Sequence, residues 1–167
     1  MRTLLVLMLC AAAGCSSDNS VWSSSVSRLV LRSAGGFLQP SQPTADCPTE
    51  GVEYTLVVAG RSLSVRRCSP GRTDPYPLML TAVSRALTGA EFDALVPKLQ
   101  ALRVISVDTC GADKPEVTVT VTTPGGTHEY ADSFYSCPND NDTRPTIDTA
   151  ALDAALQAFG QLLFPDP

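Results

Sequence analysis

The sequence predicts an α+β fold in which an antiparallel sheet packs against two helices as a two-layer sandwich. Three observations lead to this prediction. Short runs rich in Val, Leu and Thr are separated by turn residues, two later segments repeat apolar residues at helical spacing, and cysteines flank two of the strand pairs. With 167 residues, the chain is long enough for one domain with its own core.

The first half of the chain contains three of the predicted strands. Residues 78–87 fit the period of either a strand or a helix and are left open. A two-residue turn at Ala59-Gly60 places Cys68 opposite Gly51, which follows Cys47 by four residues. The segments rich in strand-forming residues are 26–32, 52–58 and 62–67.

The second half repeats this plan of a cysteine, a hairpin and a closing cysteine. A turn at Gly125-Gly126 places Cys137 opposite Lys114, which follows Cys110 by four residues. The strand-like segments of this half are 104–107, 117–121 and 127–135.

The repeated plan favours sequential disulfides, Cys47 with Cys68 and Cys110 with Cys137. Four cysteines allow three pairings, so a crossed arrangement stays open as the alternative. The predicted sheet is therefore built from two disulfide-closed hairpins and single strands.

Two helices are predicted to cover the sheet. Thr88 and Glu91 form a capping box at the start of the first helix, and an apolar face follows. Pro97 lies inside this helix and predicts a kink or break near residues 93–96. The second helix begins near Asp148 or Thr149 and ends before Pro165. Its apolar positions are Leu152, Leu156, Phe159 and Leu163.

The N-terminus has the pattern of an export signal. A basic start is followed by a short apolar stretch and small residues that end at Cys15. Residues 12–15, Ala-Ala-Gly-Cys, resemble a bacterial lipobox. That resemblance implies cleavage before Cys15, a diacylglycerol on its thiol and anchoring in a membrane. The alternative is an ordinary secretory signal in which Cys15 has no role.

The resemblance also sets the expected organisation of the chain. Residues 1–14 are the signal peptide, residues 15–25 are the lipidated cysteine with a Ser-rich tether, and residues 26–167 are the single α+β domain. Trp22 interrupts the tether and either packs on the domain or lies at the lipid interface. Ser16 stands where an Asp would retain the protein at the inner membrane. We therefore expect the outer membrane, facing the periplasm, in an organism that has one.

Signals for catalysis and for cofactors are weak. The net charge is −5, so no nucleic acid is expected as a partner. The single histidine, His128, is adjacent to Glu129 in a predicted strand, where their side chains point to opposite faces. We therefore interpret His128 as a surface residue and predict no enzyme and no cofactor. Carboxylates alone can hydrolyse glycosides, and three flank the second hairpin: Asp108, Asp113 and Asp132.

One run of oxygen-bearing side chains follows Cys137. Residues 139–142 read Asn-Asp-Asn-Asp, which makes Asp140 and Asp142 candidate calcium ligands. Such residues next to Pro138 are equally typical of an exposed turn. We therefore expect no metal site, with this run as the one candidate.

A set of short motifs resembles the emfourin-type proteins, which inhibit thermolysin-like metalloproteases. The motifs are Gly35-Gly36-Phe37, the segment 87–95, Asp113 before the segment 117–121, Gly125-Gly126 and the closing Leu-rich helix. This resemblance implies an inhibitor whose partner is a secreted metalloprotease. The lipid anchor, the cysteines and the hairpin between Cys47 and Cys68 depart from the family pattern.

Two functions follow as expectations, and a carboxylate-based glycosidase is a third, disfavoured one. The first is a non-enzymatic, lipid-anchored protein of the cell envelope that binds another macromolecule or supports an assembly. The second, from the resemblance, is an emfourin-like inhibitor.

Overall fold

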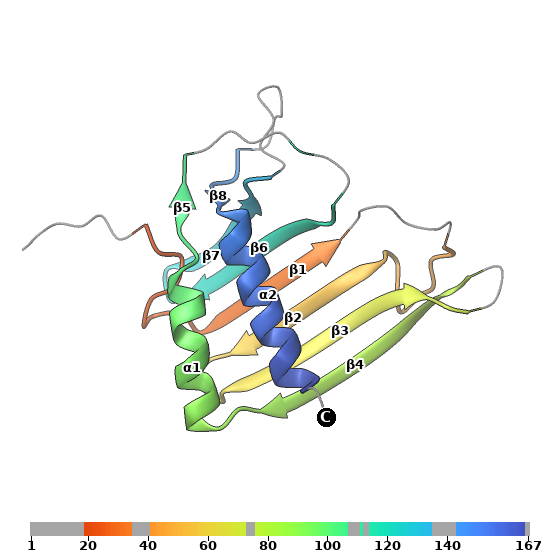
Figure 1. Ribbon diagram of the computed structural model, residues 1–167, viewed down its shortest axis with the longest axis horizontal. Helices are drawn as coiled ribbons and strands as arrows, with labels where there is room; N and C mark the ends of the chain where they lie inside the picture. Colours follow the sequence, from red (N-terminus) through yellow and green to blue (C-terminus); the bar gives the residue numbers. More distant parts are fainter. Residues whose placement is uncertain are drawn as a thin grey trace, which may run out of the picture.

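The computed structural model describes residues 19–34, 41–72, 76–106, 111, 114–134 and 143–165. Within these residues the strands form one sheet in the order β4-β3-β2-β1-β6-β7-β8-β5 (Figure 1). Neighbouring strands are antiparallel, except that β7 and β8 are parallel. The elements are β1 (Arg28–Ala34), β2 (Gly51–Val57), β3 (Ser62–Pro70), β4 (Leu78–Ala86), α1 (Gly89–Gln100), β5 (Val104–Ile105), β6 (Glu116–Thr123), β7 (Gly126–Asp132), β8 (Thr146–Ile147) and α2 (Thr149–Leu163).

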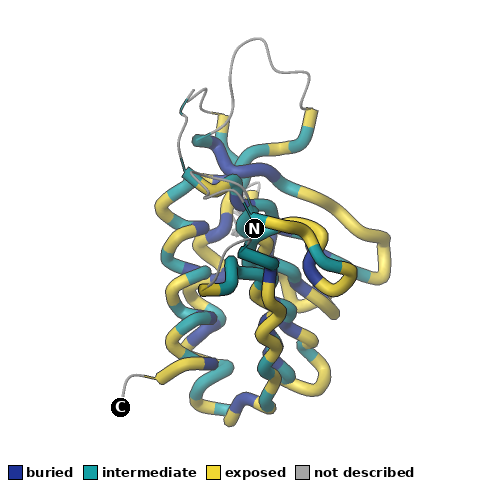
Figure 2. Tube along the Cα trace, turned by 90° about the vertical axis from the view of Figure 1, so that its right-hand side faces the viewer, coloured by how far each residue is buried: buried dark blue, intermediate teal, exposed yellow. Residues whose placement is uncertain are grey.

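One face of the sheet is buried because apolar and polar residues alternate along its central strands. In β6, Val117, Val119 and Val121 are buried, whereas the threonines between them are half-buried. Leu29 and Leu31 of β1 follow the same alternation. Buried and more exposed positions accordingly alternate along the trace in Figure 2.

Both helices lie on this buried face (Figure 1). In α2, Phe159 packs edge-on against Tyr54 of β2, with 5.8 Å between ring centroids. In α1, Leu95 and Leu99 are buried in the same core. No described helix covers the opposite side of the sheet, which we call the open face. The predicted two-layer α+β architecture is confirmed.

The helix boundaries agree with the prediction, but the break predicted near residues 93–96, before Pro97, is wrong. Thr88 caps α1 through a complete capping box with Glu91. The helix continues through Pro97 to Gln100. Pro97 and Asp93 are both exposed, so the Asp93 carbonyl that Pro97 cannot bond is accessible to water.

The register of the first hairpin is confirmed, and that of the second is corrected. Gly51 pairs with Cys68. In the second hairpin Thr123 pairs with Gly126, so the turn is Pro124-Gly125 and the predicted turn at Gly125-Gly126 is wrong. The Thr123 hydroxyl accepts a hydrogen bond from the Gly125 amide at 3.2 Å, which closes the turn one residue earlier.

The remaining differences concern the shorter elements. The ambiguous residues 78–87 form the edge strand β4. The structure describes only Val104–Ile105 as the strand expected at residues 104–107. Strand β8 was not predicted, because two residues are too few to show a period.

Residues 19–25 belong to the domain, although their composition suggested a tether. The Val21 amide donates to the Leu102 carbonyl at 2.8 Å, and the Val104 amide donates to the Asn19 carbonyl at 2.9 Å. Trp22 is 9% exposed and lies 6.5 Å from the Phe92 ring of α1. Trp22 therefore packs on the domain rather than at a lipid interface.

Candidate functional site

The open face is a broad polar surface rich in hydroxyl groups. Its central strands present threonine and serine where the buried face presents valine and leucine. Cross-strand pairing aligns one such row across the sheet, in the order Glu129, Thr120, Val30, Thr55, Ser64 and Ser84. These side chains are short and mostly uncharged, so they offer hydrogen bonds without obstructing the approach of a partner.

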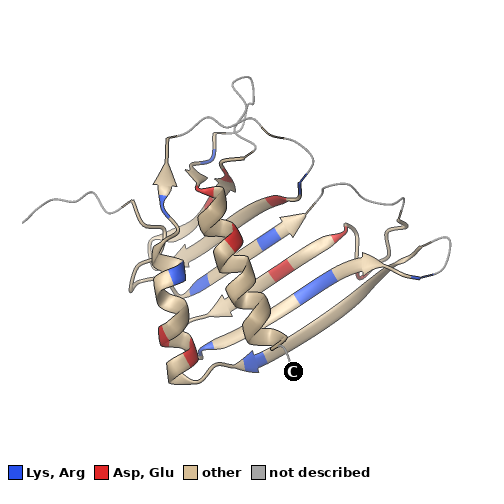
Figure 3. Cartoon of the chain, viewed as in Figure 1, with Lys and Arg blue, Asp and Glu red and all other residues tan. Residues whose placement is uncertain are grey.

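The next row of the open face carries alternating charges. Arg32 of β1 pairs with Glu53 of β2, and Glu53 pairs with Arg66 of β3. The opposite charges lie side by side across these three strands (Figure 3). Within the described residues, none of the three side chains forms an ion pair within 4.0 Å. Their charges are therefore available to a partner.

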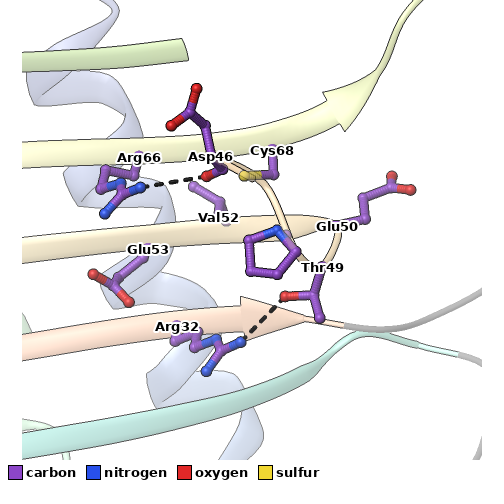
Figure 4. A pocket seen from close by; sticks show the side chains of 10 residues that line it. Arg32, Asp46, Thr49, Glu50, Val52, Glu53, Arg66 and Cys68 are labelled. Carbon is purple, nitrogen blue, oxygen red and sulfur yellow. Dashed lines mark hydrogen bonds between the residues drawn. The ribbon is translucent and has the colours of Figure 1, made fainter. Parts of the chain in front are cut away.

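The two arginines also position a loop, residues 41–50, which we call the 41–50 segment. An Arg32 guanidinium nitrogen donates to the Thr49 hydroxyl at 3.3 Å. An Arg66 nitrogen donates to the Asp46 carbonyl at 3.4 Å. Figure 4 shows both contacts, with Glu53 between the two arginines. Glu53 makes no such contact with the segment. Of the three charged side chains in the row, its carboxylate is the one with no hydrogen bond or ion pair in the described part of the chain.

The Cys47–Cys68 disulfide fastens the same segment to the sheet. Its Cα atoms are 5.5 Å apart, and Cys68 lies on the open face of β3. This bond confirms the predicted pairing of Cys47 with Cys68. Thr44 adds a second attachment, because its hydroxyl donates to the Leu78 carbonyl at 3.1 Å.

Gly51 allows the segment to join β2 closely beside β1. Its φ is +151°, a conformation that other residues rarely adopt. A Cβ atom at this position would lie 2.5 Å from the Ser33 carbonyl oxygen. The turn into β2 therefore requires glycine.

Between the segment and the sheet lies a hollow of about 200 Å³. Cofactor sites are typically about 300–1,000 Å³, so this hollow suits a single side chain of a partner better than a whole cofactor. Its charged lining is mixed in sign and consists of Arg32, Asp46, Glu50, Glu53 and Arg66.

Charges farther along the open face are already paired. Arg144 lies 2.9 Å from Glu116 and 2.7 Å from Glu129. Glu129 therefore forms an ion pair with Arg144. His128 is adjacent to Glu129 in sequence, is exposed, and lies opposite Val121 in the strand register, on the other face of the sheet. This agrees with the interpretation of His128 as a surface residue.

Asp132 is buried in a structural cluster. Lys114 lies 3.0 Å from one of its carboxylate oxygens, and the other accepts hydrogen bonds from the Phe134 amide and the Thr149 hydroxyl. The Asp132 side chain has no exposed surface. It therefore joins the end of β7 to the start of α2, and a substrate does not reach it here.

Several predicted site residues lie outside the described residues. These are Cys15, Asp108, Cys110, Asp113, Cys137, Asp140 and Asp142. The disulfide between Cys110 and Cys137, the lipid on Cys15 and the candidate calcium ligands stay predictions. In the described part of the chain, no three His, Cys, Asp or Glu residues gather as metal ligands, and no helix is long and apolar enough to cross a membrane.

Sequence reasoning missed the charged row because it depends on pairing between distant strands. The predicted register of the first hairpin already places Glu53 opposite Arg66. The pairing of β1 with β2, which adds Arg32, had no comparable signal because residues 35–50 separate these strands in sequence.

Comparison with known proteins gives no match: no protein family model, no curated protein and no solved structure is similar to this chain.

Proposed function

We propose that this chain is a lipid-anchored protein of the cell envelope that binds a partner protein through its open face and has no catalytic role. The observation that carries the proposal is the row Arg32, Glu53 and Arg66, whose charges have no ion pairs within the described residues. A partner that places a cationic side chain at Glu53 and acidic or carbonyl groups at the arginines would complement it.

The location of the 41–50 segment supports a binding role. The disulfide and the arginine contacts hold this segment beside the charged row, so less of it needs to be ordered when a partner binds. The hollow beside it accepts one side chain. A fixed loop beside unpaired charges is an arrangement that favours recognition over catalysis.

The cellular location rests on two features of the chain. Disulfides persist in oxidising compartments, which include the bacterial periplasm. The lipobox resemblance at Cys15 supports anchoring there, at the outer membrane facing the periplasm in an organism that has one. We expect no cofactor and no nucleic acid partner.

Glu53→Gln tests the proposed surface with little effect on the fold. Asp93→Asn is the matched control, because Asp93 is an exposed carboxylate on α1, in the layer over the other face. Immobilised wild-type and variant chains are compared for the partner that each retains from an envelope extract. A charge-assisted hydrogen bond contributes about 1.5–3 kcal/mol, so we expect Glu53→Gln to weaken retention by roughly tenfold or more.

The control variant should behave differently from Glu53→Gln. Asp93→Asn should retain the partner as the wild type does. Equal retention by Glu53→Gln and the wild type would refute the open face as the binding surface. Stoichiometric inhibition of a thermolysin-like protease by the wild-type chain would instead support the emfourin-like alternative.

A further inference from the structure

The two ends of the sheet are protected very differently. At one end, residues 19 and 20 lie along β5, through the hydrogen bond from the Val104 amide and a bridge between Ser20 and Arg103. At the other end, β4 pairs along its length with β3, and among the described residues its outer side is bonded only at Leu78. Strand β4 forms the lower border of the sheet in Figure 1.

The hydrogen bonds at both ends of β4 show which of its backbone groups face outward. The Gly71 amide donates to the Pro77 carbonyl, and the Leu87 amide donates to the Arg61 carbonyl. Odd-numbered residues therefore bond to β3, and the backbone groups of even-numbered residues point away from it. The Leu78 amide accordingly donates outward, to the Gln42 carbonyl at 2.8 Å.

Beyond Leu78, the outward groups have no backbone partner within the described residues. The residues concerned are Leu80, Ala82, Ser84 and Ala86, all of them exposed. A free edge of this length is normally interrupted by a charge, a proline or a bulge. Strand β4 has no proline, and its one charged residue is Arg85, which is bonded to Glu91 of α1 and to the Leu162 carbonyl of α2.

Apolar side chains also gather at this edge. The large apolar residues exposed in the described part of the chain are Val57, Met79, Leu80 and Phe164. Met79 and Leu80 belong to β4, on opposite faces of the sheet. Phe164 lies 5.8 Å from the Arg67 guanidinium, and Arg67 pairs with Thr81 of β4. Two of these four residues therefore belong to the unprotected strand, and Phe164 packs on a residue of the neighbouring strand β3.

We propose that the free edge of β4 pairs with the same edge of a second copy of this chain. The free part runs from Leu80 to Ala86 and is centred on Val83. In an antiparallel pairing about a two-fold axis at Val83, the free part of one copy lies opposite the whole free part of the other. Leu78, which is bonded to the 41–50 segment, stays outside the pairing. Leu80 then lies opposite Ala86 of the other copy, and Ala82 lies opposite Ser84.

The strand is complementary to itself in this register. Val83 meets its own symmetry mate on the helix side, and Arg85 lies opposite Thr81, so no like charges face each other. A two-fold axis between antiparallel strands is normal to the sheet. The open faces of the two copies therefore form one continuous surface.

Paired lysine substitutions test the pairing. Ala82→Lys with Ser84→Lys places like charges opposite each other across the proposed interface. Ala82→Lys with Ser84→Glu is the matched control, because it places opposite charges there. The full-length chain is extracted in detergent, and native mass spectrometry gives the number of copies.

We expect two copies for the wild type, one for the double-lysine variant and two for the Lys–Glu variant. A single copy for the wild type, or two copies for the double-lysine variant, would overturn the pairing. A single copy for the Lys–Glu variant would overturn the register at Val83. Circular dichroism checks that both variants keep the fold.

Hydrogen exchange on the unsubstituted chain gives a second test that needs no variant. Pairing protects the amides of Leu80, Ala82, Ser84 and Ala86, which otherwise face solvent. Slow exchange at these positions supports the proposal. Fast exchange in the purified chain overturns it, and is the result expected if the edge binds a strand of another protein.

Discussion

Arg85 connects both helices to the edge of the sheet through one side chain. Its guanidinium forms two bonds to the Glu91 carboxylate, at 2.7 and 3.3 Å, and donates to the Leu162 carbonyl at 2.8 Å. Glu91 also accepts bonds from the Thr88 amide and hydroxyl. The capping box that the sequence predicts is therefore the centre of a contact between α1, α2 and β4.

This arrangement predicts how stability depends on pH. The hydrogen bond from Arg85, followed by those from Thr88, lowers the pKa of Glu91 from 4.5 to about 2. A lowered pKa means that the folded state binds the proton less tightly than the unfolded state does. The stabilisation is therefore complete above pH 4.5 and is lost as the pH falls toward about 2.

Glu91→Gln should show the effect as a change in the unfolding midpoint. We expect this variant to be less stable than the wild type at neutral pH, with the difference shrinking between pH 4.5 and about 2. Asp93→Asn, in the same helix turn, serves as the control. A difference for Glu91→Gln that stays constant across this range would contradict the assignment.

At the scale of elements, the 41–50 segment is the part whose position depends most on one covalent bond. The Cys47–Cys68 disulfide closes a loop with a sequence separation of 21. In the chain-entropy model a bond closing such a loop contributes about 3 kcal/mol to the free energy of unfolding. We expect Cys47→Ser with Cys68→Ser to lower the stability by about that amount, as measured by urea unfolding.

The same variant also separates two roles of the disulfide, which are to position the 41–50 segment and to stabilise the whole fold. If the disulfide positions the 41–50 segment for binding, partner retention should fall even under conditions where the variant is fully folded. Unchanged stability would show that the bond does not stabilise the fold, and full retention of the partner would show that it does not position the segment for binding.

Local sequence patterns predicted the helices and strands well where the apolar residues follow one period, either that of a helix or that of a strand. The capping box and the apolar positions of α2 located both helices, and Ala59-Gly60 fixed the register of the first hairpin. Strand β4 was ambiguous because apolar residues occupy both of its faces at the sheet edge. The turn before β7 was misplaced because the bond from the Gly125 amide to the Thr123 hydroxyl outweighs the preference for two glycines.

The candidate site was less predictable than the elements. Its cysteines and its hairpin were visible in sequence, whereas Arg32 joins the row of charges only because β1 pairs with β2. Strand order is decided by packing across the whole sheet. No local pattern in the chain encodes it.

At the scale of the whole molecule, Asn19 and Ser20, the first described residues, lie toward the opposite end of the sheet from the charged row. The chain enters the domain beside β5, whereas the row spans β1 to β3. Residues 16–18 separate Cys15 from Asn19 and span roughly 10 Å when extended. A lipid on Cys15 would hold the β5 end near the membrane and leave the row accessible.

Cys15→Ala tests the lipid anchor on which this orientation depends. The mature wild-type chain should begin at Cys15 and carry the mass of the attached lipid. The variant should lack that mass and move to the soluble fraction of the envelope. A mature wild-type chain that begins elsewhere, or carries no lipid, would refute the lipobox.

The most direct test of the open face as the binding surface is a photo-crosslinking residue placed at Thr55, which lies on the open face between β1 and β3. The same residue at Ala94, on the exposed side of α1, is the control. In cells that express the full chain, we predict a crosslink to a partner protein from position 55 and none from position 94. Crosslinks from position 94 alone, or from neither position, would contradict the account.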